Sequence, residues 1–323
     1  MNQRKLYTLL KREYWEHRGA MKWTPIWIGA SILAIMLLGW ITGQSTMFRV
    51  EGADHLVEGG LKMLENNATP EQLRAGTAAM LYGTGAIFSV AMFFVLFFYC
   101  LGALYDDRRD RSVLFWRSLP VSDLETVLSK LAMVLVVIPL VYFAAIIAFH
   151  LVMLLVAGLL IAFQGGSPVK LLWGPVEPFS YWGRLLVALG LQALWLLPLY
   201  GWLFLVSAWA RSKPFLWAVM VPVVLSILEA WVNLTASLRL GFRFGDLLLS
   251  RITTGFAPMS FHADVGNQEI NIGGSPGDAF NTEWGQLMER AVSLNLWIGV
   301  LIGAAMIAAA IWLRRYRDDS ATE

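Results

Sequence analysis

Six apolar runs dominate the chain, and each is long enough to cross a lipid bilayer as a helix. A bilayer-spanning helix needs about 20 mostly apolar residues. The run 131–163 contains no charged residue, yet it is shorter than the roughly 40 residues that two spans and a turn would need. We therefore expect one long, tilted helix there. The predicted spans are 25–42, 84–104, one within 131–163, 185–210, 214–234 and 291–313.

Composition supports this pattern. Hydrophobic residues make up 57% of the 323 residues and charged residues 15%, and the mean hydropathy is +0.59. Soluble domains carry about 25% charged residues. The predicted fold class is therefore an all-α integral membrane protein. A net charge of +2 gives no reason to expect a nucleic-acid partner, and the single cysteine, Cys100, excludes both a disulfide within the chain and a cysteine metal cluster.

The basic residues predict the orientation. Loops rich in Lys and Arg stay in the cytoplasm. The N-terminus, segment 105–130, the link 211–213 and the C-terminal tail are accordingly predicted to be cytoplasmic, and 43–83, 164–184 and 235–290 to face outward across the plasma (inner) membrane. Of the 25 basic residues, the cytoplasmic set is Arg4, Lys5, Lys11, Arg12, Arg18, Lys22, Arg108, Arg109, Arg111, Arg117, Lys130, Arg211, Lys213, Arg314, Arg315 and Arg317.

Local signals predict two helices that begin or lie outside the apolar core. Thr69 offers an N-cap and Gln72 its capping-box partner, so the second span should begin well before its apolar run. Residues 3–18 combine basic side chains with an apolar face, which is typical of a helix lying in the inner membrane interface. A plain charged cytoplasmic tail is the alternative. The proposed apolar face consists of Leu6, Tyr7, Leu10 and Tyr14.

The motifs of the common catalytic classes are missing. The sequence contains no GxxxxGK[ST], HExxH or GxSxG, so we expect no nucleotide hydrolysis and no catalytic residues in this chain. The four histidines fall on different segments, which argues against a metal site. We expect no cofactor bound by the chain itself. His150, late in the third run, is interpreted as an interfacial residue.

Glu229 is the one acidic residue inside a predicted span, and Asn233 follows it on the same helix face. Ionisable residues in a span suggest function, here a polar contact in a translocation path. The alternative is a position close to the outer surface, because Glu229 lies about 22 Å from Pro214 along a helix. Trp195, Trp202 and Trp209 recur every seven residues in the fourth span, so they should share a helix face. They could line a substrate path, but we interpret them as packing or lipid contacts.

The most specific segment is predicted to be cytoplasmic. Residues 106–111 form a dense mixed-charge turn, and a short amphipathic helix follows until Leu119-Pro120 ends it. Ser122 can cap the next helix, with Glu125 as capping-box partner. A solvated loop is the alternative, but it would not need so many apolar side chains. Such side chains need a surface to bury against, either lipid headgroups or a partner protein.

This segment resembles the cytoplasmic loop between the second and third spans of type-two ABC exporter permeases. The basic N-terminal residues 11–16 also resemble that family, and the six-span layout fits over essentially the whole chain. The family often has glutamates where this chain has aspartates. The matching residues are Asp107, Asp110, Arg111, Ser112, Leu114, Phe115, Ser118, Leu119, Pro120, Ser122, Asp123 and Lys130.

The resemblance implies a single transmembrane permease domain over 1–323. It implies two separate ATPase subunits that hold ATP and Mg²⁺, a second copy of this chain or a homologous permease, and surrounding membrane lipids. Segment 106–120 would be the coupling helix that docks on the ATPase. Alternatives are an ion-coupled secondary transporter, a membrane-embedded enzyme and a non-transporting sensor. The expected coupling residues are Asp110, Arg111, Ser112, Leu114, Phe115, Trp116, Arg117 and Leu119.

Overall fold

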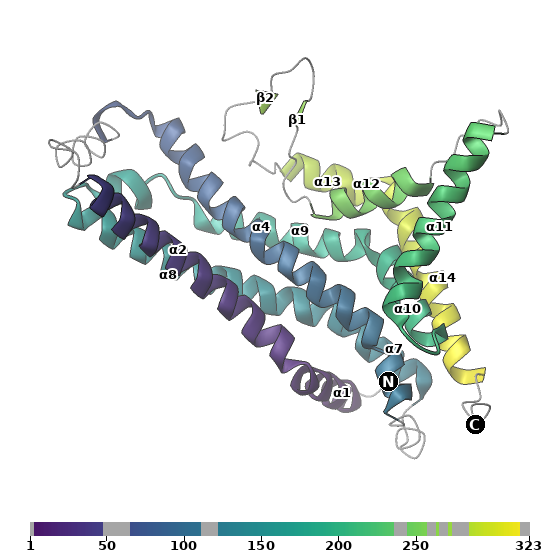
Figure 1. Cartoon of the computed structure of the whole chain (residues 1–323). Coiled ribbons are helices and arrows are strands. Elements are labelled where there is room, and N and C mark those ends of the chain that lie inside the picture. The colour runs from purple at the N-terminus through teal and green to yellow at the C-terminus, as the bar shows by residue number, and fades with distance from the viewer. Residues whose placement is uncertain are drawn as a thin grey trace.

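The computed structural model describes residues 3–47, 65–110, 122–235, 244–256, 263–264, 271–272 and 284–316. Helices make up nearly all of it (Figure 1). Those labelled η are short π-helical stretches. The elements in chain order are α1 (Gln3–Glu16), η1 (Gly19–Trp23), α2 (Thr24–Met47), α4 (Pro70–Gly102), α5 (Tyr105–Arg109), α7 (Asp123–Ala132), η2 (Met133–Val137), α8 (Ile138–Phe163), η3 (Val169–Trp173), α9 (Pro178–Trp195), α10 (Leu197–Trp209), α11 (Pro214–Thr235), α12 (Phe244–Phe256), β1 (Ala263–Asp264), β2 (Asn271–Ile272), α13 (Trp284–Val292) and α14 (Leu294–Tyr316).

The predicted class, an all-α integral membrane protein, is confirmed. Within the described residues, five continuous helices are long and apolar enough to cross a membrane, and a sixth crossing results if one bent pair counts as a single span. The continuous ones are Gly19–Thr42, Pro70–Arg109, Asp123–Phe163, Pro214–Asn233 and Leu294–Tyr316. β1 and β2 form one short antiparallel pair between α12 and α13.

Both predicted capping boxes are present. The Thr69 hydroxyl accepts a hydrogen bond from the Gln72 N–H, and the Gln72 side chain accepts one from the Thr69 N–H, so α4 begins at Pro70. Ser122 and Glu125 make the same pair of bonds at the start of α7. Such boxes satisfy N–H groups that the first helical turn leaves without partners. They are local signals, which is why the sequence predicts them well.

The run 131–163 is one long helix, as predicted. It extends from Asp123 to Phe163 through α7, η2 and α8. The π-helical stretch η2 ends two residues before Pro139, whose ring has no N–H and clashes with the carbonyl four residues earlier. Widening the turn at Met133–Val137 accommodates this proline without breaking the helix.

The fourth predicted span, 185–210, is not one straight helix. It consists of α9 and α10, and the α9 side of the break is bent from α10 by 48°. The break falls at Leu196, directly before Leu197-Pro198, because Pro198 cannot donate the next helical hydrogen bond. Trp195 therefore lies on a different helix axis from Trp202 and Trp209, and the predicted tryptophan face is wrong at its first member.

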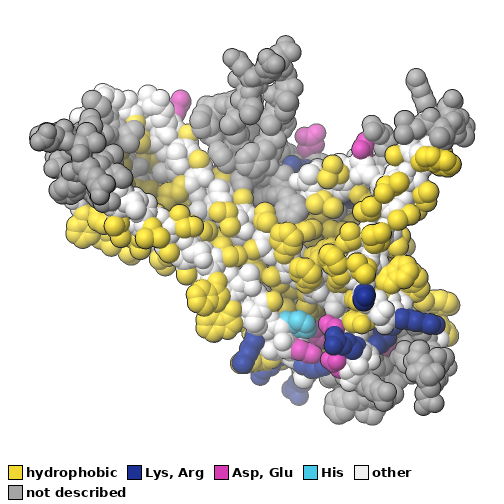
Figure 2. Space-filling model, viewed as in Figure 1, with side chains coloured by type: hydrophobic (Ala, Val, Ile, Leu, Met, Phe, Trp, Pro, Cys, Tyr) yellow, Lys and Arg dark blue, Asp and Glu magenta, His cyan; other side chains and the backbone are white. Residues whose placement is uncertain are grey.

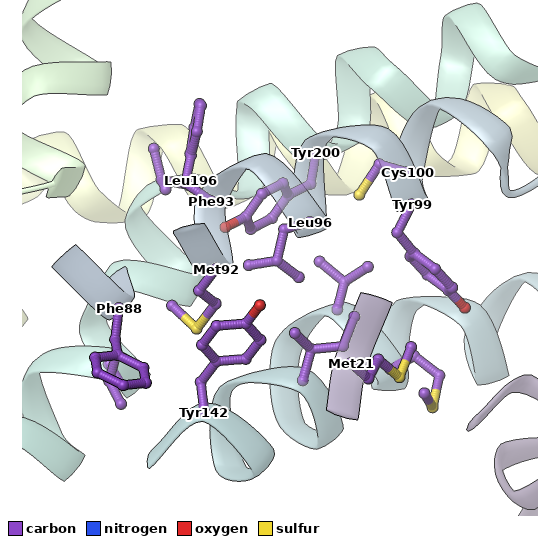
Figure 3. Close-up of a cluster of buried hydrophobic side chains, with 14 of the residues drawn as sticks. Met21, Phe88, Met92, Phe93, Leu96, Tyr99, Cys100, Tyr142, Leu196 and Tyr200 are labelled. Atoms are coloured by element: carbon purple, nitrogen blue, oxygen red, sulfur yellow. The ribbon is translucent and has the colours of Figure 1, made fainter. Parts of the chain in front are cut away.

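The core lies where α4, α8, η2 and α10 meet. Phe88, Met92, Leu96, Tyr142 and Tyr200 are almost fully buried there (Figure 3). Helices α10 and α14 pack most extensively, at a contact between small residues. A Cβ on Gly201 would lie 2.7 Å from the Gly303 carbonyl oxygen, so only glycine permits this approach. Such contacts are a common way for membrane helices to associate.

Candidate functional site: a buried charge cluster

Charged side chains gather at the end of the molecule where both termini emerge, whereas the visible flank along the helices is mostly hydrophobic (Figures 1 and 2). Five of these side chains form one connected network, which we call the charge cluster. Its members come from α1, α5, α7 and α14, elements far apart in the sequence. They are Glu13, Asp107, Asp123, Lys130 and Arg314.

Lys130 lies at the most buried point of the charge cluster. Its Nζ is 3.0 Å from a Glu13 carboxylate oxygen and 3.5 Å from an Asp107 oxygen, and the Lys130 and Glu13 side chains are each 3% exposed. Tyr99 at the edge of the hydrophobic core donates its hydroxyl to the other Glu13 oxygen at 2.9 Å (Figure 3). Buried charges are tolerated when they are paired and hydrogen-bonded, as these are.

Arg314 contacts residues on both sides of segment 111–121, which lies within the predicted cytoplasmic loop. One guanidinium nitrogen, Nη1, lies 3.1 Å from an Asp107 oxygen, and Nε lies 3.0 Å from an Asp123 oxygen. Asp107 belongs to α5, just before residues 111–121, and Asp123 begins α7, just after them. A single side chain at the end of the last helix therefore holds both flanks of that segment.

The N-terminal side of segment 111–121 is also hydrogen-bonded to α10. The chain bends between α4 and α5, and the Leu104 and Tyr105 N–H groups both donate to the buried Ser207 hydroxyl at 2.9 Å. Arg108 donates to the Ser207 and Ala210 carbonyls at the end of α10, at 2.6 and 3.0 Å. The last carbonyl groups and the first N–H groups of a helix have no partner within that helix. The bonds from Arg108 therefore satisfy carbonyls at the end of α10, and the bonds to Ser207 satisfy N–H groups at the start of α5.

The N-terminal helix α1 packs against α7, and its buried face differs in part from the predicted one. Leu9 and Glu13 are its most buried residues, whereas Tyr7, assigned to the apolar face, is 67% exposed. Glu13 stands at the helical spacing of Leu6, Leu9 and Leu10. This acidic residue at an otherwise apolar helix position was the sequence feature from which a buried ion pair could have been predicted. From the sequence, Glu13 stood out only within the family-like run 11–16, and Arg314 only as a basic residue of the cytoplasmic side.

The predicted coupling residues fall almost entirely outside the described residues. Asp110 is exposed and follows the last residue of α5, with its N–H donating to the Asp106 carbonyl at 3.0 Å. Arg111, Ser112, Leu114, Phe115, Trp116, Arg117 and Leu119 belong to 111–121, which the structure does not describe, so their role stays a prediction.

Glu229 and Asn233 lie one helical turn apart near the end of α11. Both Glu229 carboxylate oxygens accept from the Phe244 N–H, at 3.0 and 2.8 Å, so Glu229 caps the start of α12. The Asn233 side-chain oxygen is buried and has no hydrogen-bond partner among the described residues. Glu229 thus binds protein, while a role of either residue in translocation stays a prediction.

His150 is not interfacial, contrary to expectation. It is fully buried, and the Trp182 indole N–H donates to its Nδ1 at 3.2 Å. Because indole nitrogen only donates, Nδ1 is the acceptor and the neutral ring carries its proton on Nε2, which is 3.0 Å from the Thr84 hydroxyl. His150 therefore joins α4, α8 and α9 as a neutral packing residue.

The fold and the comparisons together define a class. The molecule is a multi-pass, all-α membrane protein. Residues 75–167, which include α5, Asp107, Asp123 and Lys130, match the family model of the ABC-2 family transporter protein. This match supports the resemblance to type-two ABC permeases, whose members are membrane components of ABC transporters, over that part of the chain. Searches of curated proteins and of solved structures gave no significant match.

Proposed function

We propose that this chain is the membrane-spanning subunit of an ATP-driven exporter, and that separate ATPase subunits bind segment 106–120. Two ATPase subunits would hold ATP and Mg²⁺, and a second copy of the chain or a homologous permease would complete the translocation path. The observation that carries this proposal is that Asp107 and Asp123, on either side of residues 111–121, are both ion-paired to Arg314, and that Asp107 also contacts Lys130. A loop with no mechanical role would not need such anchoring.

The charge cluster is suited to pass on a displacement. Removing one partner from a buried ion pair costs about 3–5 kcal/mol, so a push on segment 106–120 should move its partners rather than separate them. The moving parts would be α1 through Glu13, α14 through Arg314, and the long helix that begins at Asp123. That helix has 41 residues and is about 60 Å long, enough to reach the opposite membrane surface.

The proposed orientation places both termini and the charge cluster in the cytoplasm of a plasma (inner) membrane, with one permease domain over 1–323. The cluster is at the same end as the basic residues, which supports this orientation. Glu229 at the far end of α11 holds α12 by its first N–H group, so we place Glu229 and Asn233 at the outer end of the path.

The ion-coupled alternative is less well supported. Secondary transporters carry ionisable residues near the bilayer midplane at their binding sites. In the described part of the chain, the buried Asp, Glu, Lys and Arg residues are Glu13, Asp107 and Lys130, and with Arg314 they form ion pairs at one end of the bundle. An arrangement at one end fits transmission between a partner and the spans better than ion binding at mid-depth.

Replacing two anchors of the segment tests the proposal. Phe115→Ala with Trp116→Ala should leave membrane insertion intact and weaken binding of the ATPase subunit about thirtyfold, because removing a large interface anchor costs about 2 kcal/mol or more. The matched control is Phe163→Ala with Phe179→Ala, two highly exposed aromatic side chains away from the segment. Unchanged ATPase binding and transport in the first variant would refute the coupling role.

A further inference from the structure

A groove lies between the α10–α11 turn and the last turns of α14. These elements are at the same end of the molecule as the charge cluster (Figure 1). Its volume is about 590 Å³. We call it the aromatic groove, because four rings and two polar residues dominate its lining. These are Trp209, Trp217, Trp312, Tyr316, Arg211 and Ser212. None of them belongs to the predicted coupling or translocation residues.

The aromatic groove lies at the depth where apolar helices give way to basic residues. α10 ends at Trp209, α11 begins at Pro214, and the apolar run of α14 ends at Leu313 before Arg314 and Arg315. Tryptophan and tyrosine concentrate at this level of a membrane because their rings are apolar while their N–H and O–H groups need water or headgroups. The groove is therefore at the membrane–water interface.

The rings form two walls with exposed faces. Trp209 and Trp217 meet edge to face with centroids 5.0 Å apart, and Trp312 and Tyr316 pack with centroids 5.4 Å apart. These four side chains remain 44–62% exposed. Rings held in pairs but left uncovered offer a preformed surface for the glycerol and upper acyl part of a lipid.

The charge of the groove is positive. Arg211 is exposed and has no ion pair among the described residues, and Arg315 lies over the Tyr316 ring at 5.6 Å. None of the lining residues is acidic. A guanidinium and a hydroxyl from Ser212 are suitable donors for a phosphate, and basic pockets between membrane helices at this level bind anionic headgroups.

We propose that the aromatic groove binds the headgroup of an anionic phospholipid from the leaflet at which both termini emerge. The helix that contributes Trp217 to the groove, α11, also carries the exposed apolar side chains Leu216 and Met220, which offer acyl chains a surface. A soluble partner would gain nothing from that apolar surface, which favours a lipid. The proposal rests on membrane insertion and goes beyond the proposed function, since it requires no ATPase.

A bound lipid would also act on the charge cluster. Ala210 lines the groove, and its carbonyl accepts from Arg108 on α5. Leu313 lines the groove as well and directly precedes Arg314. Occupation of the groove therefore stabilises the same helix ends that hold segment 106–120, so anionic lipid should raise the thermal stability of the chain.

Lipid retention by the purified chain, without any ATPase, tests the proposal. Native mass spectrometry in detergent is carried out with added phosphatidylglycerol or phosphatidylcholine. The chain should retain phosphatidylglycerol preferentially, and Arg211→Gln should weaken that binding about tenfold, the typical effect of losing one charge-assisted hydrogen bond. The matched control is Arg18→Gln, which changes an exposed arginine directly before η1.

A second measurement distinguishes lost lipid binding from misfolding of Arg211→Gln. Phosphatidylglycerol should raise the midpoint of thermal unfolding of the wild type and of Arg18→Gln, and leave that of Arg211→Gln almost unchanged. Equal retention of both lipids, or an unchanged affinity in Arg211→Gln, would overturn the proposal. So would a disulfide between two copies carrying Trp217→Cys in intact membranes, because the groove would then be an interface between chains.

Discussion

Lys130 makes the most direct test of the charge cluster. In Lys130→Met, Asp107 keeps Arg314 as a partner, but Glu13 keeps only the Tyr99 hydroxyl among the contacts described here. Glu13 is 3% exposed, so the variant leaves a buried carboxylate without a cation. Removing one member of a buried ion pair costs about 3–5 kcal/mol, and we expect a loss in that range in the free energy of unfolding.

A second substitution should restore much of this loss. Glu13→Gln removes the uncompensated charge, while its amide oxygen can still accept from Tyr99. The double variant should therefore be more stable than Lys130→Met by about 2 kcal/mol. Unfolding by SDS in mixed micelles, followed by the fluorescence of the 15 tryptophans, supplies the free energies for a double-mutant cycle.

The matched control for this cycle is Lys11→Met, which removes an exposed lysine from the same end of α1. An exposed ion contributes little, and the change should stay within about 0.5 kcal/mol. Two results would refute the reasoning: a loss below about 1 kcal/mol in Lys130→Met, or a double variant no more stable than that single variant.

Three further predictions concern topology and packing. A cysteine at position 60 should react with an impermeant reagent outside intact cells, whereas one at position 320 should not; labelling of 320 would invert the proposed orientation. Gly303→Ala should lower the free energy of unfolding by about 1–3 kcal/mol in the same SDS assay, because the added Cβ would lie 2.7 Å from the Leu197 carbonyl group and weaken the α10–α14 contact. Gly190→Ala is the control. A Cβ there meets nothing within 4 Å, so the change should be neutral. Arg251→Gln should lower the midpoint of thermal unfolding in detergent. Arg251 donates to the Trp195 and Asn295 carbonyls, and its guanidinium lies over the Trp195 ring at 4.6 Å. An unchanged midpoint would show that the break at Leu196 does not depend on Arg251.

Local features of the fold were predictable. The apolar runs, the capping boxes at Thr69 and Ser122, and the single long helix over 131–163 depend on neighbouring residues, and all are present. The break at Leu196 was harder to predict from the sequence. Pro198 signalled a weak point, but Arg251, 56 positions after Trp195, supplies a partner for the freed Trp195 carbonyl. Such a contact depends on the tertiary fold.

The charge cluster shows the same limit for the site. Asp107, Asp123 and Lys130 stood out through their family resemblance, yet nothing in the linear sequence paired them with Glu13 or Arg314. Arg314 follows Asp107 by 207 positions, and only the packing of α14 beside α5 and α7 brings them together. The unusual position of Glu13 on an apolar helix face was a signal in the sequence, but it did not identify a partner.

Cross-linking from segment 106–120 tests the central claim most directly. A photo-reactive amino acid in place of Phe115, activated in native membranes, would be compared with the same group in place of Phe163 at the end of α8. We expect mass spectrometry to find an adduct with a protein carrying the GxxxxGK[ST] nucleotide-binding motif from position 115 and none from position 163. Adducts from position 115 with lipid alone, or with this chain alone, would contradict the account.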